Sequence, residues 1–164
     1  MNGLARFFNN RGMKLIFSVA ITLSVGAIAG FFTSEGVNGW YAMATKPSFN
    51  PPNWVFAPVW TLLYILMGTA LWLVWKNKTI KTVKQTAIIL FSLQLLLNFA
   101  WSFIFFYMHQ PGWAFIEIIG MWMLIMLTIV WFGKISPAAA WLMVPYIWWV
   151  SFAAVLNFYI WKLN

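Results

Sequence analysis

The chain has 164 residues, of which 63% are hydrophobic and 7% charged. Water-soluble domains are about 45–50% apolar and about 25% charged, so this composition excludes a soluble globular protein and indicates a membrane protein. With no Cys, one His and two acids, the chain also lacks the residues for a zinc site, a two-carboxylate hydrolase or a conventional catalytic triad. The net charge of +8 comes from basic residues spread between long apolar runs, which favours orientation in a bilayer over nucleic-acid binding.

Five apolar stretches are long enough to cross a membrane. A spanning helix needs about 20 mostly apolar residues, and the stretches that qualify are 14–34, 54–75, 86–107, 113–133 and 138–161. Backbone polar groups must be paired inside lipid, so each stretch is predicted to be helical. We therefore predict an all-α integral membrane protein, a single bundle of five transmembrane helices that forms one domain over residues 1–164.

The basic residues predict how the bundle is oriented. Eight fall on the side of the N-terminus: Arg6, Arg11, Lys14, Lys76, Lys78, Lys81, Lys84 and Lys134. Only Lys46 and Lys162 fall on the other side. Cytoplasmic loops carry an excess of Lys and Arg, so we expect a cytoplasmic N-terminus, with the first loop and the C-terminus outside.

The first span allows two interpretations. Its segment Ala27-Ile28-Ala29 imitates a signal-peptidase site, which would make the span a cleaved leader. The same run contains Gly26 and Gly30, spaced so that helix backbones approach closely within the bundle or across a dimer. The second interpretation is favoured, and an intact-mass measurement separates the two.

The loop over residues 35–53 is the only long connection. It contains Pro47, Pro51 and Pro52, and each proline fixes its own φ and restricts the residue before it. A stiff aromatic lid is one interpretation. An ordinary interfacial linker with Trp40 and Trp54 as anchors is the other.

The 13 tryptophans divide by depth. Those near helix ends, where an aromatic belt is typical, are Trp54, Trp72, Trp75, Trp113, Trp131, Trp141 and Trp161. Those predicted to sit deeper are Trp60, Trp101, Trp122, Trp148 and Trp149. An indole N–H at that depth has no water, so we expect each deep tryptophan to find a partner inside the protein.

Helical spacing aligns several deep tryptophans with polar residues. Gln94, Asn98 and Trp101 share one face of the third span, and Pro145, Trp149, Ala153 and Asn157 follow at steps of four in the fifth. Amides at membrane depth normally face the bundle interior. Either they line an aromatic cavity that suits a planar apolar ligand, or they join helices within a packed core.

Two ionisable residues lie near the outer side. Glu117 would pair with a basic group, line a pocket mouth or be hydrated there. His109 falls in a tight turn, which indicates a loop residue rather than a haem ligand. No histidine lies within a span, so any bound tetrapyrrole would be held by shape and stacking.

Several segments resemble one known family. They are Trp40-Tyr41, the run KPSFNPPNWVFAPVW from Lys46 to Trp60, Leu63-Tyr64-x-x-Met67-Gly68, LNFAWS from Leu97 to Ser102, and Pro145-Tyr146-x-x-Trp149-x-x-Phe152-Ala153-x-x-Leu156-Asn157. These are similar to the tryptophan-rich sensory protein and translocator protein family (TspO/MBR), formerly the peripheral benzodiazepine receptors. The resemblance covers nearly the whole chain, and the lack of Cys is more like a bacterial member, in the cell membrane, than a mitochondrial one.

The resemblance implies a membrane receptor or sensor that regulates tetrapyrrole or stress responses. Such a protein binds porphyrins, notably protoporphyrin IX, and related hydrophobic ligands in an aromatic cavity under the first loop, commonly as a homodimer in contact with membrane lipid. It needs no cofactor or metal and binds no nucleic acid. The positions that match the family's ligand cavity are Tyr41, Pro51, Trp60, Asn98, Trp101, Trp113, Trp149 and Ala153.

Two other functions are implied by the same resemblance. One is light-dependent degradation of protoporphyrin IX, for which Trp60 and Trp149 match the implicated catalytic tryptophans. The other is passive translocation of porphyrin or a cholesterol-like lipid. The pattern Leu156-x-x-Tyr159-x-x-Lys162 meets a loose cholesterol motif, although a belt tyrosine and a snorkelling lysine explain it equally well.

Overall fold

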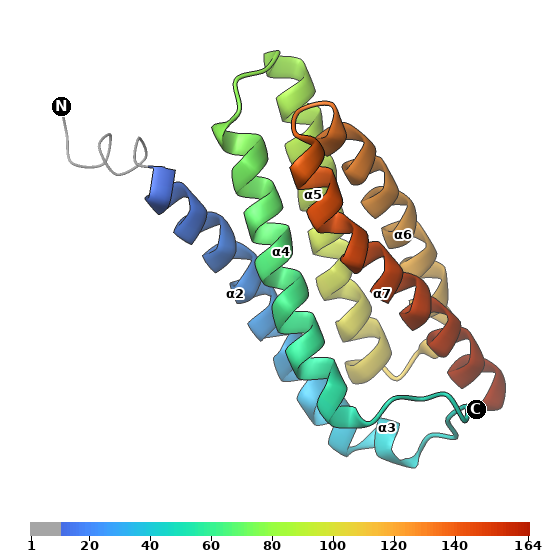
Figure 1. Cartoon of the computed structure of the whole chain (residues 1–164). Coiled ribbons are helices and arrows are strands. Elements are labelled where there is room, and N and C mark those ends of the chain that lie inside the picture. The colour runs from blue at the N-terminus through green and yellow to red at the C-terminus, as the bar shows by residue number, and fades with distance from the viewer. Residues whose placement is uncertain (1–10) are drawn as a thin grey trace.

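Five long helices make up most of the protein in the computed structural model, which describes residues 11–164 (Figure 1). They are α2 (Arg11–Asn38), α4 (Phe56–Lys76), α5 (Lys81–Ser102), α6 (Pro111–Gly133) and α7 (Pro137–Leu163). Each is long and apolar enough to cross a membrane. The predicted all-α architecture with five transmembrane helices is confirmed, while residues 1–10, including Arg6, lie outside the described part.

Three short elements complete the described chain. Helix α3 (Trp40–Met43) and the 3₁₀ turn η1 (Asn53–Val55) lie in the first loop, and the π-helical turn η2 (Phe103–Tyr107) continues α5. Helix α2 extends four residues past the predicted end of its span, so the first loop begins at Gly39. Helices α6 and α7 each begin at a proline, a residue that suits the first helical position because no partner is needed for its nitrogen.

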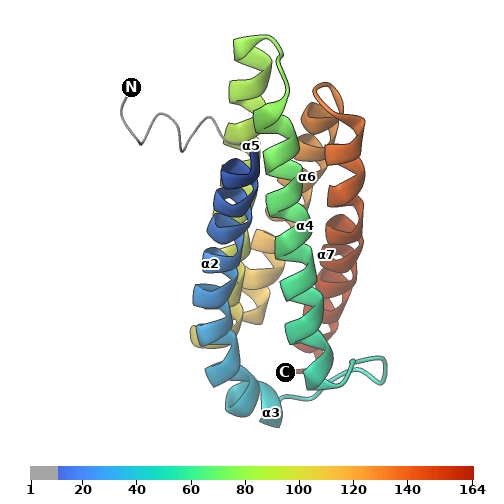
Figure 2. The same cartoon turned by 60° about the vertical axis from the view of Figure 1, so that its left-hand side comes forward.

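The five helices form a ring around one core. Helix α2 packs against α4, α4 against α7, α7 against α6, and α6 against α5. The ring closes where α5 and η2 contact α2. Figures 1 and 2 place α3 and the loop after it across one end of the bundle, beside the end of α7. The described chain starts near the other end of the bundle. Residues 11 and 164 would therefore lie on opposite sides of a membrane, as an odd number of spans requires.

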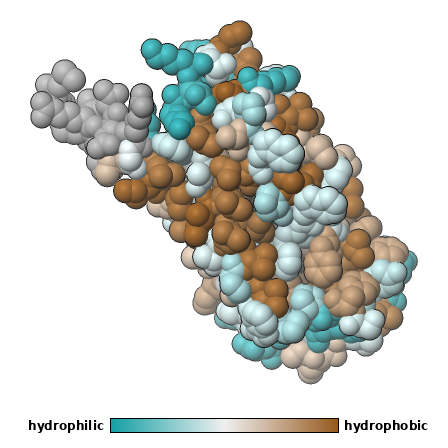
Figure 3. Space-filling model, viewed as in Figure 1, coloured by the Kyte–Doolittle hydropathy of each residue, from teal (hydrophilic) through white to brown (hydrophobic). Residues whose placement is uncertain are grey.

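The outer surface of the bundle is apolar in the middle. Bulky side chains that point away from the core include Ile16, Leu62, Ile89 and Ile116. In Figure 3, hydrophobic residues dominate the middle of the visible face, and hydrophilic residues gather toward its two ends. This distribution fits a protein surrounded by lipid along its length.

Helices α2 and α4 approach closely because glycine is present at their contact. A Cβ placed on Gly68 would lie 2.6 Å from the Cα of Val19, and one placed on Gly26 would collide with the ring of Tyr64. The hydroxyl of Thr22 donates a hydrogen bond to the carbonyl of Tyr64 at 2.7 Å. Gly30, in contrast, has open space around it, so only Gly26 of the predicted pair packs inside the bundle.

Candidate functional site

The first loop is held in one shape by its own side chains. Tyr41 is 2% exposed, and its hydroxyl donates a hydrogen bond to Oδ1 of Asn50 at 2.6 Å. The ammonium group of Lys46 donates to the carbonyls of Ala42 and Ala44, both at 3.2 Å. Burial raises the pKa of Tyr41 to about 12, although its hydrogen bond to Asn50 lowers the pKa in part. We call residues 39–52 the lid.

The lid is fastened to the end of α7. The ring of Phe49 packs edge-on against Tyr159, with 5.3 Å between the ring centroids. The side chain of Asn164 accepts from the backbone N–H of Thr45 at 2.9 Å and donates to the carbonyl of Thr45 at 3.0 Å. These contacts join segments more than a hundred residues apart, so the lid is part of the tertiary structure rather than a free linker.

A first group of rings lies directly beneath the lid, at η2. Trp101 stacks on Phe105 at 5.0 Å, and Phe105 in turn meets Trp40 at 5.5 Å. Tyr41 packs against Phe106 at 5.7 Å. The π-helical turn that carries Phe105 and Phe106 departs from regular α geometry, as such turns often do near functional sites.

A second group of rings lies between α4 and α7. Trp60 stacks on Tyr64 at 5.7 Å and meets the ring of Tyr146 at 6.2 Å. Trp149 packs against Phe56 at 6.1 Å and against Phe152 at 5.6 Å. The two tryptophans that the family resemblance singles out therefore lie among rings from both helices.

Two asparagines connect these rings across the bundle. The hydroxyl of Tyr64 donates to Oδ1 of Asn98, and Nδ2 of Asn98 donates to the hydroxyl of Tyr146 at 3.1 Å. The indole of Trp101 donates to Oδ1 of Asn157 at 3.0 Å. The amides of Asn98 and Asn157 therefore join helices, as expected for a packed core. They also lie beside the aromatic rings that an aromatic ligand cavity would need.

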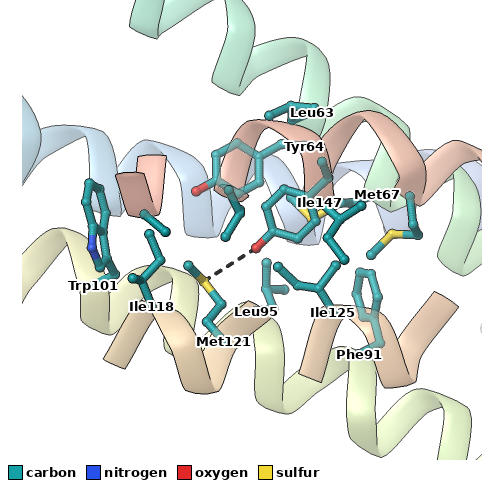
Figure 4. Close-up of a cluster of buried hydrophobic side chains, with 14 of the residues drawn as sticks. Leu63, Tyr64, Met67, Phe91, Leu95, Trp101, Ile118, Met121, Ile125 and Ile147 are labelled. Carbon is teal, nitrogen blue, oxygen red and sulfur yellow. Dashed lines mark hydrogen bonds between the residues drawn. The ribbon is translucent and has the colours of Figure 1, made fainter. Parts of the chain in front are cut away.

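The packing around these amides is shown in Figure 4. The labelled Tyr64, Trp101 and Met121 come from three different helices and face the same interior. The dashed line that ends at the sulfur of Met121 comes from the hydroxyl of Tyr146, at 3.6 Å. Helix α6 therefore contributes to the same cluster as α4, α5 and α7.

Three buried side chains in the described part of the chain have polar atoms without a hydrogen-bond partner. They are the amide of Gln94, both carboxyl oxygens of Glu117 and the indole nitrogen of Trp149. Native proteins leave few such atoms, because each one costs about 1–3 kcal/mol. Of these three, the family resemblance marked only Trp149 as a site residue. The sequence signal for Glu117 is its position as a lone acid in an apolar span.

The predicted site residues do not all meet. Tyr41, Trp60, Asn98, Trp101 and Trp149 take part in the ring and amide contacts described above. Ala153 is half-buried one turn beyond Trp149, and Pro51 is half-buried in the lid. The family resemblance does not mark Phe56, Tyr64, Phe105 or Tyr146 as site residues. The four-residue spacing of Trp60 with Tyr64 and of Trp101 with Phe105 nevertheless predicts that each pair shares a helix face.

Trp113 lies apart from the cluster, with 66% of its surface exposed. It lines an open groove of about 430 Å³ at the start of α6, together with Gln110, Pro111, Gly112, Ile116, Trp161 and Asn164. Gly112 leaves room for the neighbouring indole, since a Cβ there would lie 2.8 Å from the indole nitrogen of Trp161.

The prediction that each deep tryptophan finds a partner inside the protein is wrong for Trp148 and for Trp149, whose indole nitrogen is buried without a partner. Trp101 and Trp122 have the expected internal partners, the latter through a 2.8 Å hydrogen bond to Ser151. Trp148, however, is 72% exposed. One residue is a rotation of about 100° on a helix, so Trp148 points outward while Trp149 points into the bundle.

His109 is a loop residue, as its sequence context predicts. It adopts a φ of 54° in the connection between η2 and α6, and its ring stacks on Trp40 at 5.5 Å. Within residues 11–164, no group of three His, Cys, Asp or Glu side chains is arranged to hold a metal ion.

The whole bundle matches known proteins in sequence. A model of the TspO/MBR family matches residues 18–162. The chain is 41% identical over 156 residues to the tryptophan-rich protein TspO of Chlorobaculum tepidum, covering 95% of this chain and 99% of that protein. It is 42% identical over 154 residues to the tryptophan-rich protein TspO of Archaeoglobus fulgidus, with 93% and 97% covered. It is 39% identical over 149 residues to the human translocator protein, with 90% and 88% covered. The chain therefore belongs to the TspO/MBR family of membrane proteins.

Proposed function

We propose that this protein is a membrane receptor or sensor that binds a porphyrin such as protoporphyrin IX among the rings beneath the lid. The observation that carries the proposal is two aromatic pairs between α4 and α7, Trp60 with Tyr146 and Phe56 with Trp149. The amide of Asn98 bonds the hydroxyl of Tyr146 beside the first pair. A flat apolar molecule gains most from stacking on such rings, and a few fixed amides orient it. Two relatives carry the names translocator protein and tryptophan-rich sensory protein, in agreement with a ligand-responsive role.

The tryptophans, the amide of Asn98 and the lid would have different roles in binding. Trp60 and Trp149 offer faces and edges for stacking, while the lid closes the end of the bundle above them. Asn98 already bonds Tyr64 and Tyr146, so it holds these rings in place for a ligand. The lid would restrict exchange with the aqueous side, because it is fastened at Phe49 and at Thr45.

Adjacent tryptophans provide the test. Protoporphyrin IX is titrated into the detergent-solubilised protein, and the quenching of tryptophan fluorescence is followed to saturation. Trp149→Phe should weaken binding by up to about tenfold, since an aromatic pair is worth about 0.5–1.5 kcal/mol and the smaller ring keeps part of the stacking. Trp148→Phe is the matched control, because its ring faces away from the bundle. Equal quenching curves for the two variants, or no saturation in the wild type, would reject the proposal.

A second candidate is light-dependent degradation of bound protoporphyrin IX by dioxygen, with indoles as electron donors. The observation that favours it is the indole nitrogen of Trp149, which is buried without a partner and lies in the ring group that includes Trp60. Illumination of the aerated complex should then give a product spectrum that the Trp60→Phe, Trp149→Phe double variant does not give. The same spectrum from both proteins would exclude a role for these indoles.

We also propose that the N-terminus faces the cytoplasm of a bacterial cell. The support is the distribution of charge: Lys76, Lys78, Lys81 and Lys84 flank the α4–α5 connection, and Lys134 follows α6 at the same end of the bundle. Labelling of single cysteines introduced at Lys78 and at Ser48 with a membrane-impermeant reagent tests it. Intact cells should react at Ser48 and not at Lys78.

A homodimer is our proposal for the assembly. The support is the open space around Gly30 on an outward face of α2, where a second helix backbone could come close. Light scattering of the purified protein should give twice the chain mass. Gly30→Leu should shift it toward the monomer, and an unchanged dimer would place the interface elsewhere.

A further inference from the structure

Glu117 is an acid inside a transmembrane helix and has no hydrogen-bond partner among residues 11–164. Both of its carboxyl oxygens are buried and have no hydrogen-bond partner. The other acid of the chain, Glu35, is exposed near the end of α2. A polar group at membrane depth is costly to keep, and such residues commonly mark the pathway or the binding site of a ligand.

The basic groups at the same end of the bundle are engaged elsewhere. The ammonium of Lys46 donates to lid carbonyls, as described above. The ammonium of Lys162 lies over the ring of Trp161, 4.4 Å from its centroid. A carboxyl with a structural role would have a partner, since a buried charge is tolerated when it is paired and hydrogen-bonded. Glu117 has no such partner among the described residues.

The position of Glu117 connects it to the ring and amide cluster. Met121 is one turn further along the same face of α6, and its sulfur accepts the hydrogen bond from Tyr146. Ile118, the residue after Glu117, is 1% exposed and is drawn near Trp101 in Figure 4. Trp149 on the neighbouring helix α7 presents an unpartnered donor. The interior thus holds an unused acceptor on α6 and an unused donor on α7.

We propose that Glu117 is a specificity-determining residue, whose carboxyl oxygen accepts a hydrogen bond from an N–H donor on a flat aromatic ligand. The inference rests on the proposed ligand site, but it does not require the ligand to be a porphyrin. It predicts that the site distinguishes ligands by the presence of one donor rather than by shape alone. A ligand with an N–H supplies the hydrogen-bond donor that the Glu117 carboxyl lacks. The carboxyl should therefore increase the affinity for such a ligand and should not increase the stability of the fold.

Carbazole and N-methylcarbazole test this selectivity, because both are flat and apolar and they differ by one N–H. Equilibrium dialysis of the full-length protein in detergent gives the affinity for each. The wild type should bind carbazole about tenfold or more tightly than its methylated form, as expected for a hydrogen bond to a charged or strongly polar group. Glu117→Leu should abolish that ratio, and Glu117→Gln should keep part of it because an amide oxygen still accepts. Glu35→Gln is the matched control and should behave as the wild type.

Thermal stability separates a ligand-binding role from a structural one. Leucine at position 117 removes a buried carboxyl that has no partner, so Glu117→Leu should melt at the same temperature as the wild type or higher. Retention of the carbazole preference in Glu117→Leu would overturn the inference. So would a wild type that does not prefer carbazole, or a Glu117→Leu protein that melts lower and binds both probes more weakly.

A parallel titration with protoporphyrin IX keeps the two proposals apart. If carbazole binding depends on Glu117 and protoporphyrin IX does not bind saturably, the inference holds and the porphyrin function fails. If protoporphyrin IX binds while the carbazole ratio is the same in wild type and Glu117→Leu, the porphyrin function holds and the inference fails.

Discussion

Replacing Asn98 with leucine removes the amide that connects α4, α5 and α7. Its Oδ1 accepts from Tyr64, and its Nδ2 donates to Tyr146 at 3.1 Å. Asn98 is 2% exposed, so water does not reach the two hydroxyls after the change. Leucine has a similar volume to asparagine and adds no polar group. A loss of unfolding free energy in Asn98→Leu is therefore due to the missing hydrogen bonds rather than to a cavity.

The size of the effect follows from the number of bonds lost. Hydrogen bonds between side chains in a membrane protein are worth about 0.6 kcal/mol on average and about 1.7 kcal/mol at most. Two bonds disappear in Asn98→Leu, so we expect a loss of about 1–3 kcal/mol in the free energy of unfolding. Tyr64→Phe removes one of the two, and its loss should be about half as large.

Unfolding by SDS titration in mixed micelles measures these differences, with helical circular dichroism as the signal. The Tyr64→Phe, Asn98→Leu double variant completes a cycle in which the two losses should not add, since both single changes break the same bond. Two results would refute the reasoning: an Asn98→Leu protein as stable as the wild type, or losses that add in the double variant.

Three further changes test the close packing and the lid. Gly68→Ala should destabilise the protein by about 1–3 kcal/mol because the new methyl meets the backbone of α2. Gly120→Ala is the control: a Cβ there has open space, so its unfolding midpoint should stay the same or rise slightly. Tyr41 should ionise near pH 12, seen as tyrosinate absorbance that is missing in Tyr41→Phe. The folded protein keeps the Tyr41 proton above the ordinary pKa of 10.0, whereas the unfolded chain loses it there. The contribution of Tyr41 to stability is therefore constant at lower pH and declines between about pH 10 and 12. Ionisation of Tyr41 at the ordinary pKa would contradict its burial. Asn164→Ala removes both bonds to Thr45, so backbone amides of the lid should exchange hydrogen faster while those of α5 do not change.

The sequence was sufficient to predict the spans and part of the interior. Length and hydrophobicity decide which segments cross a bilayer, because lipid requires about 20 apolar residues in helical form whatever the neighbours are. The spacing of Gln94, Asn98 and Trp101 likewise placed them on one face, and all three are buried. Both conclusions follow from properties of a single helix in lipid.

The sequence pattern did not predict how each helix is rotated about its own axis. Trp148 and Trp149 have the same depth and the same chemistry, yet one is 72% exposed and the other contacts Phe56 and Phe152. Trp113 matched a cavity position and lies in an outer groove instead. Which side of a helix faces the core depends on the fit against its neighbours, as at Gly68 and Val19, and hydropathy carries little information about that fit.

The sequence alone therefore determined that this protein is a membrane bundle of five helices. Tertiary structure decided that the bonds of Thr45 to Asn164 fasten the lid to α7. It also decided that the carboxyl of Glu117 finds no partner in the described part of the chain. The physical reason is that insertion into lipid depends on the sum of side-chain transfer energies along one segment. A hydrogen bond or its absence depends on the positions of two atoms from segments that only the assembled bundle brings together.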